Sequence, residues 1–185
     1  DEDAITVWFA NTMTHVGGYS TSKIQKFYLG NNVTEICEWA FYGCNSLSGN
    51  LILPISITKI NNDAFANLDS IDSLFPYLPN CVYFGAGSFK GSSGFNGILS
   101  VTGEISGDTV FSMVGVKKIN IKSGTTSLGG GSTFDNMTNL KEIYIDSSAV
   151  AGLASSGSGL LENENLTDVY IKSNLTIGAY FANHS

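Results

Sequence analysis

The sequence predicts a β-rich α/β fold, a solenoid of stacked repeats with a parallel strand face and short helical or 3₁₀ turns opposite. Two observations support this prediction. The stretch Val33–Leu53 returns as Ile57–Leu74, with apolar residues at the same positions. Units this short cannot bury an apolar face alone, so they become stable by stacking on one another. The second observation is a row of phenylalanines at separations of 24, 24, 22 and 23 residues: Phe41, Phe65, Phe89, Phe111 and Phe134.

The inward positions of the repeat define the predicted core. The two best copies share six of them: Val33/Ile57, Ile36/Ile60, Ala40/Ala64, Phe41/Phe65, Cys44/Leu68 and Leu47/Ile71. A third, less regular copy has Cys81, Phe84, Ser88, Phe89 and Phe95. We expect each Ala-Phe step to form a short turn of helix or 3₁₀. The phenylalanine ring would then fill the space between the two faces of the solenoid.

A second pattern, L-x-x-I-x-I, predicts the strands. It occurs in IQKFYL (24–29), VKKINI (116–121), LKEIYI (140–145) and LTDVYI (166–171). Alternation of apolar and polar residues is typical of a strand with one buried face. Because one such segment occurs in each unit, we expect parallel strands from successive units to lie side by side, about 4.8 Å apart.

We expect one domain over residues 1–185. Residues 1–22 break the repeat and are expected to cap the first coil, with a strand candidate at Ala4–Ala10. Repeats follow over 23–172, and 173–185 form an incomplete final repeat or a C-terminal cap. Whether the chain is a fragment of a longer repeat array stays open. Two segments rich in Gly, Ser and Thr are expected to be longer loops at the coil rims: 103–133 and 147–160.

Composition excludes several classes of partner. The net charge is −7 with only 9 basic residues, so a phosphate backbone would be repelled and we expect no nucleic-acid binding. No run approaches the roughly 20 apolar residues that span a bilayer, so we expect no membrane insertion by this chain. Charged residues make up only 14% of the sequence, which favours short strands joined by uncharged polar turns.

The three cysteines predict neither a metal site nor a disulfide framework. Cys44 and Cys81 fall at inward positions and are expected to be buried apolar residues, while Cys37 follows an inward residue and should point outward. No Cys-x-x-Cys or Cys/His pairing suggests a metal site. We expect no cofactor.

The phrase V-T-x-I-x-x-x-A-F-x-x-C-x-x-L at Val33–Leu47 resembles the BspA-like leucine-rich repeat. The linking segment Leu53–Ile60 is similar to the L-P-x-S-V-T-x-I step of the same family. This resemblance implies a right-handed leucine-rich-repeat solenoid. It also implies a secreted or surface-attached protein, commonly of host-associated bacteria, that takes part in adhesion to host proteins or to other cells.

The sequence offers little for catalysis. The two histidines, His15 and His184, lie near opposite ends, and no G-x-S-x-G motif is present. Carboxylate pairs of the kind used in glycoside hydrolysis fall at strand edges or loops, where surface charge is expected anyway. These pairs are Asp69/Asp72, Glu142/Asp146 and Glu162/Glu164. We therefore expect no enzyme and assign no catalytic residue.

The strand face is the better candidate for function. One outward residue lies between the two inward residues of each strand, which gives the column Tyr28, Ile52, Phe75, Ser100, Asn120, Tyr144 and Tyr170. Glu142 and Asp168 belong to the neighbouring outward column. Exposed tyrosines suit recognition of a protein or a sugar, although β-propensity alone also places aromatic residues on strands. Our ligand-binding candidates are Tyr28, Ile52, Asn120, Glu142, Tyr144, Asp168 and Tyr170.

The sequence therefore favours a non-enzymatic extracellular module for binding or adhesion. Its partner would be a protein or glycan on a host cell or a neighbouring cell. One alternative is an architectural spacer within a larger surface protein. A carbohydrate-active enzyme is the third hypothesis and the least favoured.

Overall fold

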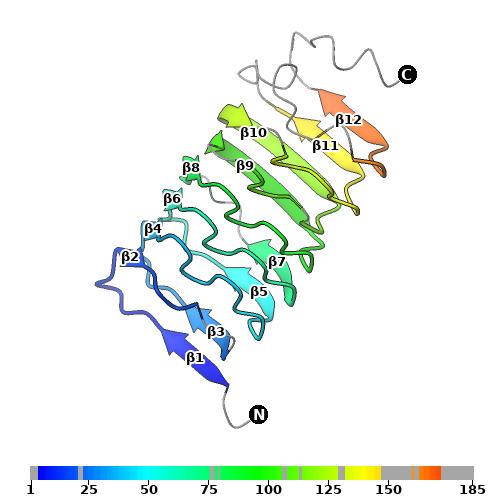
Figure 1. Ribbon diagram of the computed structural model, residues 1–185. Helices are drawn as coiled ribbons and strands as arrows, with labels where there is room; N and C mark the ends of the chain where they lie inside the picture. The colour runs from blue at the N-terminus through cyan, green and yellow to red at the C-terminus, as the bar shows by residue number, and fades with distance from the viewer. Residues whose placement is uncertain are drawn as a thin grey trace.

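The computed structural model is a solenoid whose coils follow one another from β1 to β12 (Figure 1). It describes residues 4–20, 23–75, 78, 80–105, 108–112, 114–128, 132–146, 160 and 163–171. The strands are β1 (Ile5–Trp8), β2 (His15–Val16), β3 (Ile24–Tyr28), β4 (Glu35–Ile36), β5 (Gly49–Ile52), β6 (Lys59–Ile60), β7 (Ile71–Phe75), β8 (Tyr83–Phe84), β9 (Ile98–Ile105), β10 (Lys118–Leu128), β11 (Glu142–Ile145) and β12 (Asp168–Ile171).

All pairings between these strands are parallel, which confirms the predicted parallel β-solenoid. Eight strands form one sheet in the order β12-β11-β10-β9-β8-β6-β4-β2. Two smaller sheets contain β1 with β3 and β5 with β7.

The coils place their strand residues in two columns. The first strand column contains β1, β3, β5, β7, β11, β12 and the first halves of β9 and β10. The second contains β2, β4, β6, β8 and the second halves of β9 and β10. Strand β9 belongs to both, because Ile98–Val101 pairs with Lys118–Ile121 and Glu104 pairs with Tyr83. The sequence predicted only the first column as a strand face.

The predicted α/β class, with short turns of helix or 3₁₀ at the Ala-Phe steps, is not confirmed, because no helix forms at these steps in the described residues. Each Ala-Phe step is a turn whose backbone bonds to the next coil: Phe41 N–H donates to Ala64 O at 2.8 Å and Phe65 N–H to Ser88 O at 2.8 Å. Left-handed backbone on both sides of the phenylalanine prevents a helix from forming. These positive-φ residues are Trp39, Asp63, Gly87, Thr109 and Ser132 before it, and Gly43, Asn67, Gly91 and Asn136 after it.

The expected rim loop over 103–133 is also wrong in part, because β9 extends to Ile105 and β10 covers Lys118–Leu128. Gly103 allows this continuation, since its φ is +71° and an added Cβ would lie 2.5 Å from Val82 Cα. Thr125 is buried within β10, where its hydroxyl donates to the carbonyl oxygen of Lys122 at 2.8 Å. The other expected loop, 147–160, lies outside the described residues except for position 160.

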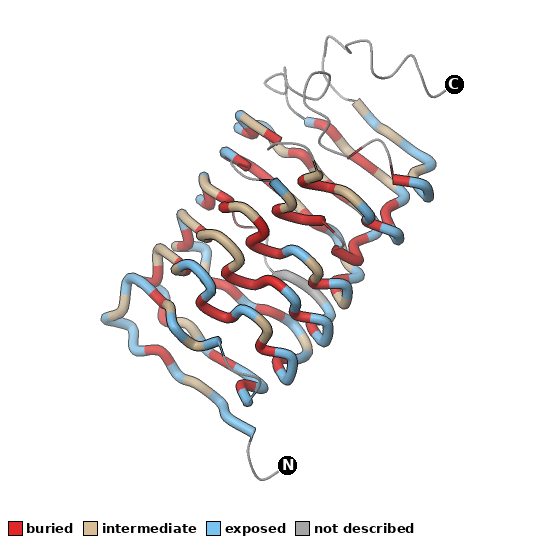
Figure 2. Tube along the Cα trace, viewed as in Figure 1, coloured by how far each residue is buried: buried red, intermediate tan, exposed pale blue. Residues whose placement is uncertain are grey.

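Buried residues recur in each coil (Figure 2), and phenylalanines are among the largest side chains that are fully buried. Consecutive rings from Phe41 to Phe134 stack with centroids 5.4–5.7 Å apart, and Phe27 stacks on Phe41 at 4.3 Å. Aromatic rings prefer such offset parallel arrangements, which add to the free energy gained by burying them. The predicted inward positions of the two best copies are all buried.

Two polar residues replace the apolar residue at the Cys44 position of the repeat. Ser92 donates its hydroxyl to Phe65 O at 2.8 Å and accepts from Leu68 N–H at 3.2 Å. Asn163 is bonded in the same way to the preceding coil. Ser88 is different, because its buried hydroxyl has no hydrogen-bond partner among the described residues.

We predict that Ser88→Ala raises the free energy of unfolding by about 1 kcal/mol, because an unpaired buried hydroxyl costs roughly 1–3 kcal/mol. The two preceding coils already carry alanine at this position, as Ala40 and Ala64. The matched control is Ser92→Ala, which should lower the stability by about 1–3 kcal/mol because Leu68 N–H loses its acceptor. Urea titration of both variants checks the prediction, and a destabilised Ser88→Ala protein would contradict it.

All three cysteines are free thiols. Cys44 and Cys81 are buried, as the sequence predicts, whereas Cys37 is half-buried. Burial raises the pKa of Cys81 to about 12. Burial, followed by the nearby charge of Glu35, also raises the pKa of Cys37. The Cys37 and Cys81 thiols are therefore poor nucleophiles, since the thiolate is the reactive form.

We predict that iodoacetamide at pH 8 modifies the folded protein only slowly and mainly at Cys37. Cys44 and Cys81 should react once urea unfolds the chain. Mass spectrometry of the intact protein against time measures both phases. In a Cys37→Ser variant the slow native phase should disappear, and rapid native labelling of that variant would show that the buried thiols are accessible.

Candidate functional site

The outward residues of the first strand column form the candidate site. Each points away from the core because its two neighbours in the strand point inward. Where strands pair, the register aligns these residues side by side, as for Tyr144 and Tyr170. In chain order the described side chains are Trp8, Tyr28, Ile52, Ser100, Asn120, Tyr144 and Tyr170. Trp8 is 72% exposed and Ile52 is 63% exposed, so the column carries large apolar groups in contact with solvent.

Five of the predicted candidates gather at the β10–β12 end of this column. The Tyr144 and Tyr170 rings stack with centroids 4.3 Å apart. Lys118 Nζ lies 3.6 Å from the centroid of the Tyr144 ring and 3.6 Å from Glu142 Oε2. The negative charge of Asp168 raises the pKa of Tyr170. Asn120 lines a shallow hollow together with the two tyrosines.

Tyr28 and Ile52, the other two candidates, lie nearer the β1 end. Tyr28 stacks on Trp8 with centroids 4.0 Å apart and an interplanar angle of 15°. Trp8 is not among the candidates expected from the sequence, because residues 1–22 break the repeat and are assigned to a cap. The signal was present in the alternation of Val7, Trp8 and Phe9, which matches that of Phe27, Tyr28 and Leu29.

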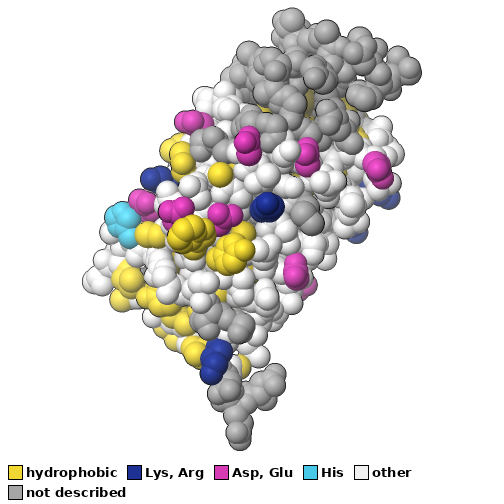
Figure 3. Space-filling model, viewed as in Figure 1, with side chains coloured by type: hydrophobic (Ala, Val, Ile, Leu, Met, Phe, Trp, Pro, Cys, Tyr) yellow, Lys and Arg dark blue, Asp and Glu magenta, His cyan; other side chains and the backbone are white. Residues whose placement is uncertain are grey.

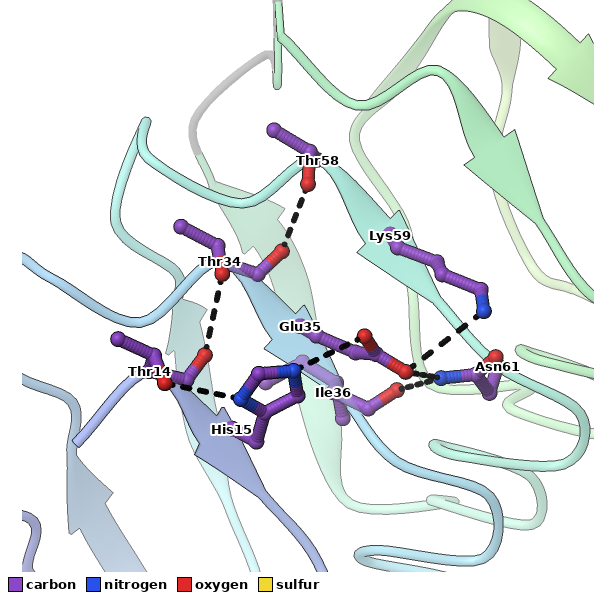
Figure 4. A network of polar contacts seen from close by, with 8 residues as sticks. All are labelled: Thr14, His15, Thr34, Glu35, Ile36, Thr58, Lys59 and Asn61. Carbon is purple, nitrogen blue, oxygen red and sulfur yellow. Dashed lines mark hydrogen bonds and ion pairs between the residues drawn. The ribbon is translucent and has the colours of Figure 1, made fainter.

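A polar network covers the start of the second strand column (Figure 4). His15 Nε2 lies 3.3 Å from Glu35 Oε2, and Lys59 Nζ lies 3.7 Å from Glu35 Oε1. Asn61 donates to the same Glu35 oxygen at 2.7 Å. The Thr34 and Thr58 hydroxyls each donate to a backbone oxygen of the coil before them.

This network contains a hydroxyl, an imidazole and a carboxylate in sequence, since Thr14 Oγ1 lies 2.8 Å from His15 Nδ1. Such groups become catalytic in a site that excludes water and presents donors to the developing charge. Here the His15 side chain is 61% exposed, as expected for a surface histidine. The arrangement therefore links neighbouring coils at an open surface.

The turns carry a further group of exposed residues. Trp39 and Tyr42 are exposed, and Trp39 Nε1–H donates to Asp63 Oδ2 at 3.3 Å. Figure 3 shows apolar side chains beside Asp and Glu side chains on this part of the surface. The turn surface thus mixes aromatic and acidic groups, without the repeated stacking seen in the first strand column.

The remaining chemical candidates are dispersed. Asp69 and Asp72 are exposed, and so is Asp146, while Glu142 is half-buried. Glu162 and His184 lie outside the described residues. Among the residues that the structure describes, no three His, Cys, Asp or Glu side chains are placed to hold a metal ion. The described part of the chain also contains no helix long and apolar enough to cross a membrane.

Comparison with known proteins agrees with this geometry. The chain matches the BspA type leucine rich repeat region, in six copies, over residues 15–129 and 77–185. No curated protein sequence matches it. A leucine-rich repeat protein of T. pallidum has a similar structure, with a TM-score of 0.60 and 18% identity over 91% of this chain and 70% of the other.

Two further solved structures resemble the chain more weakly. A leucine-rich repeat protein from Bacteroides ovatus gives a TM-score of 0.39 and 17% identity, and covers 90% of this chain. A leucine rich cell surface protein from Faecalibacterium prausnitzii gives a TM-score of 0.38 and 16% identity, and covers 91%. The chain spans 60% of the length of each. The repeat pattern, present over most of the sequence, shows that the chain belongs to the BspA-type leucine-rich repeat family.

Proposed function

We propose that this chain is a non-enzymatic binding module, located outside the cell or at its surface, that recognises a protein through the outward residues of the first strand column. The observation that carries the proposal is the pair of aromatic stacks at the two ends of that column, in which Trp8, Tyr28 and Tyr170 are exposed and Tyr144 is half-buried. Family membership supports a protein partner, since leucine-rich repeats typically serve in protein interactions. It also supports the proposed location.

The physical argument rests on exposure and rigidity. Large aromatic side chains contribute most of the binding energy at many protein interfaces. Here each pair is held in place by its own stacking, and Lys118 lies over Tyr144 as a third member at one end. A surface that is already ordered loses little side-chain entropy on binding.

We predict that the double variant Tyr144→Ala/Tyr170→Ala, or the double variant Trp8→Ala/Tyr28→Ala, weakens binding to a protein partner by about 30-fold, which corresponds to a hot spot of about 2 kcal/mol. The partner is found by surface plasmon resonance against purified extracellular matrix proteins, with a glycan array in parallel. Circular dichroism melting confirms that the variants are folded.

The matched control is Trp39→Ala/Tyr42→Ala, which removes two exposed aromatic residues from the turns. Its affinity should stay within twofold of the wild type. If this control loses binding while both strand-face variants keep it, the proposed surface is wrong. Binding to glycans alone would overturn the protein partner, and binding to no member of either panel would favour the spacer.

A further inference from the structure

A groove runs between β3 and β5, at one of two places where the ladder of the first strand column is interrupted; the other lies between β7 and β9. Strand β3 pairs with β1, and β5 pairs with β7, but β3 and β5 belong to separate sheets. A backbone hydrogen bond of 3.4 Å, from Ser48 N–H to Gln25 O of β3, joins the two coils just before β5 begins. The second strand column continues without a break across the same coils, through β2, β4 and β6.

The groove has an apolar floor and amphipathic walls. Leu47 and Leu51 are buried at its base. Tyr28 forms the wall on the β3 side, and Ile52 forms the wall on the β5 side, both exposed at the rim. The space measures about 630 Å³, including the part that is open to solvent. Such a shape accepts an apolar side chain, which would be removed from water between the two walls.

The β3 wall is ordered before any ligand arrives. Trp8 stacks on the outer side of Tyr28, and Lys26 Nζ lies 5.5 Å from the centroid of the Tyr28 ring. These contacts fix the tyrosine at the edge of the groove. A fixed wall lowers the entropic cost of binding.

Lys26 supplies the charge of the site. It is exposed, it lines the groove, and no carboxylate of the described residues forms an ion pair with it. The chain as a whole carries a net charge of −7, so this lysine is a local cation on an acidic protein. It therefore selects for a negatively charged group at this position, whereas a second copy of the acidic chain would be repelled overall.

We propose that this groove binds an extended acidic peptide segment of a partner protein. The segment inserts one apolar or aromatic side chain between Tyr28 and Ile52 and places a carboxylate against Lys26. The walls run along about four residues of strand, which corresponds to roughly 13 Å of extended peptide. The inference rests on the proposed function and deepens it, because it selects one position on the first strand column and one class of ligand. Leu47 and Leu51 at the base favour an apolar side chain and Lys26 favours a carboxylate, so an acidic peptide matches the lining better than a neutral sugar does.

The test uses a phage library of random 12-residue peptides, selected on the immobilised full chain. Enriched peptides should share an apolar residue within three positions of Asp or Glu. Labelled peptides are then titrated by fluorescence anisotropy. We expect Ile52→Asp and Lys26→Glu each to weaken binding at least tenfold. Replacing the acidic residue of the peptide by Lys should restore binding to Lys26→Glu and abolish it for the wild type.

Two variants serve as controls. Ile55→Asp changes another isoleucine that is 61% exposed but does not line the groove, and Tyr42→Ala changes an exposed tyrosine of the turns. Both should bind the peptide as the wild type does. If thermal melting shows that Ile52→Asp is unstable, Tyr28→Ala takes its place as the groove variant that should weaken peptide binding.

Three results would overturn the inference. They are the absence of any enriched peptide, binding that is indifferent to both groove variants, and binding that is lost in the Tyr144→Ala/Tyr170→Ala double variant but kept in Ile52→Asp. The third result would leave the strand-face proposal standing and remove only the groove. Failure of the proposed function is measured separately, by the matrix-protein panel and its strand-face variants.

Discussion

Hydrogen bonding from each coil to the next is the constraint on which this structure depends. A helix satisfies its own backbone, but the turns around Phe41 and Phe65 donate to oxygens of the following coil. The strands do the same through parallel pairing, and the phenylalanine stack runs along the same direction. No coil is therefore complete without its neighbours, and buried polar replacements such as Ser92 persist because they take part in the same coil-to-coil bonding.

This constraint also positions the candidate site. The backbone and the inward side chains of each coil bond to and pack against the neighbouring coils. The outward residue of each strand is therefore held at a fixed distance from the outward residues of the coils before and after it. This spacing brings aromatic neighbours such as Tyr144 and Tyr170 close enough to stack. Where the ladder is interrupted, between β3 and β5, the same regular surface opens into a groove with Tyr28 and Ile52 on opposite sides.

Much of the core could be predicted from sequence, because a strict 24-residue period aligns Phe41 with Phe65 and Phe89. The turns were not predicted, although Gly, Asn or Asp occupies most of the left-handed positions beside the phenylalanines, as at Gly43 and Asp63, and these residues favour positive φ. Trp39 carries no such signal. The full length of strand β9 was not predicted, because the register is irregular around Gly103 and the alternation of apolar and polar residues stops there. The outward column followed from the pattern, whereas the groove depends on the distance between two strands, which no residue pattern encodes.

The outward residue of each strand takes no part in the core, and this has a consequence for how the surface varies. Trp, Tyr, Ile, Ser and Asn all occupy equivalent outward positions in one chain, on essentially the same backbone. A substitution there alters the chemistry presented to solvent and leaves the inward ladder intact. The inward positions must stay apolar for the coils to stack, whereas the outward positions can change. Relatives can therefore differ in the partner they bind while they share the same scaffold.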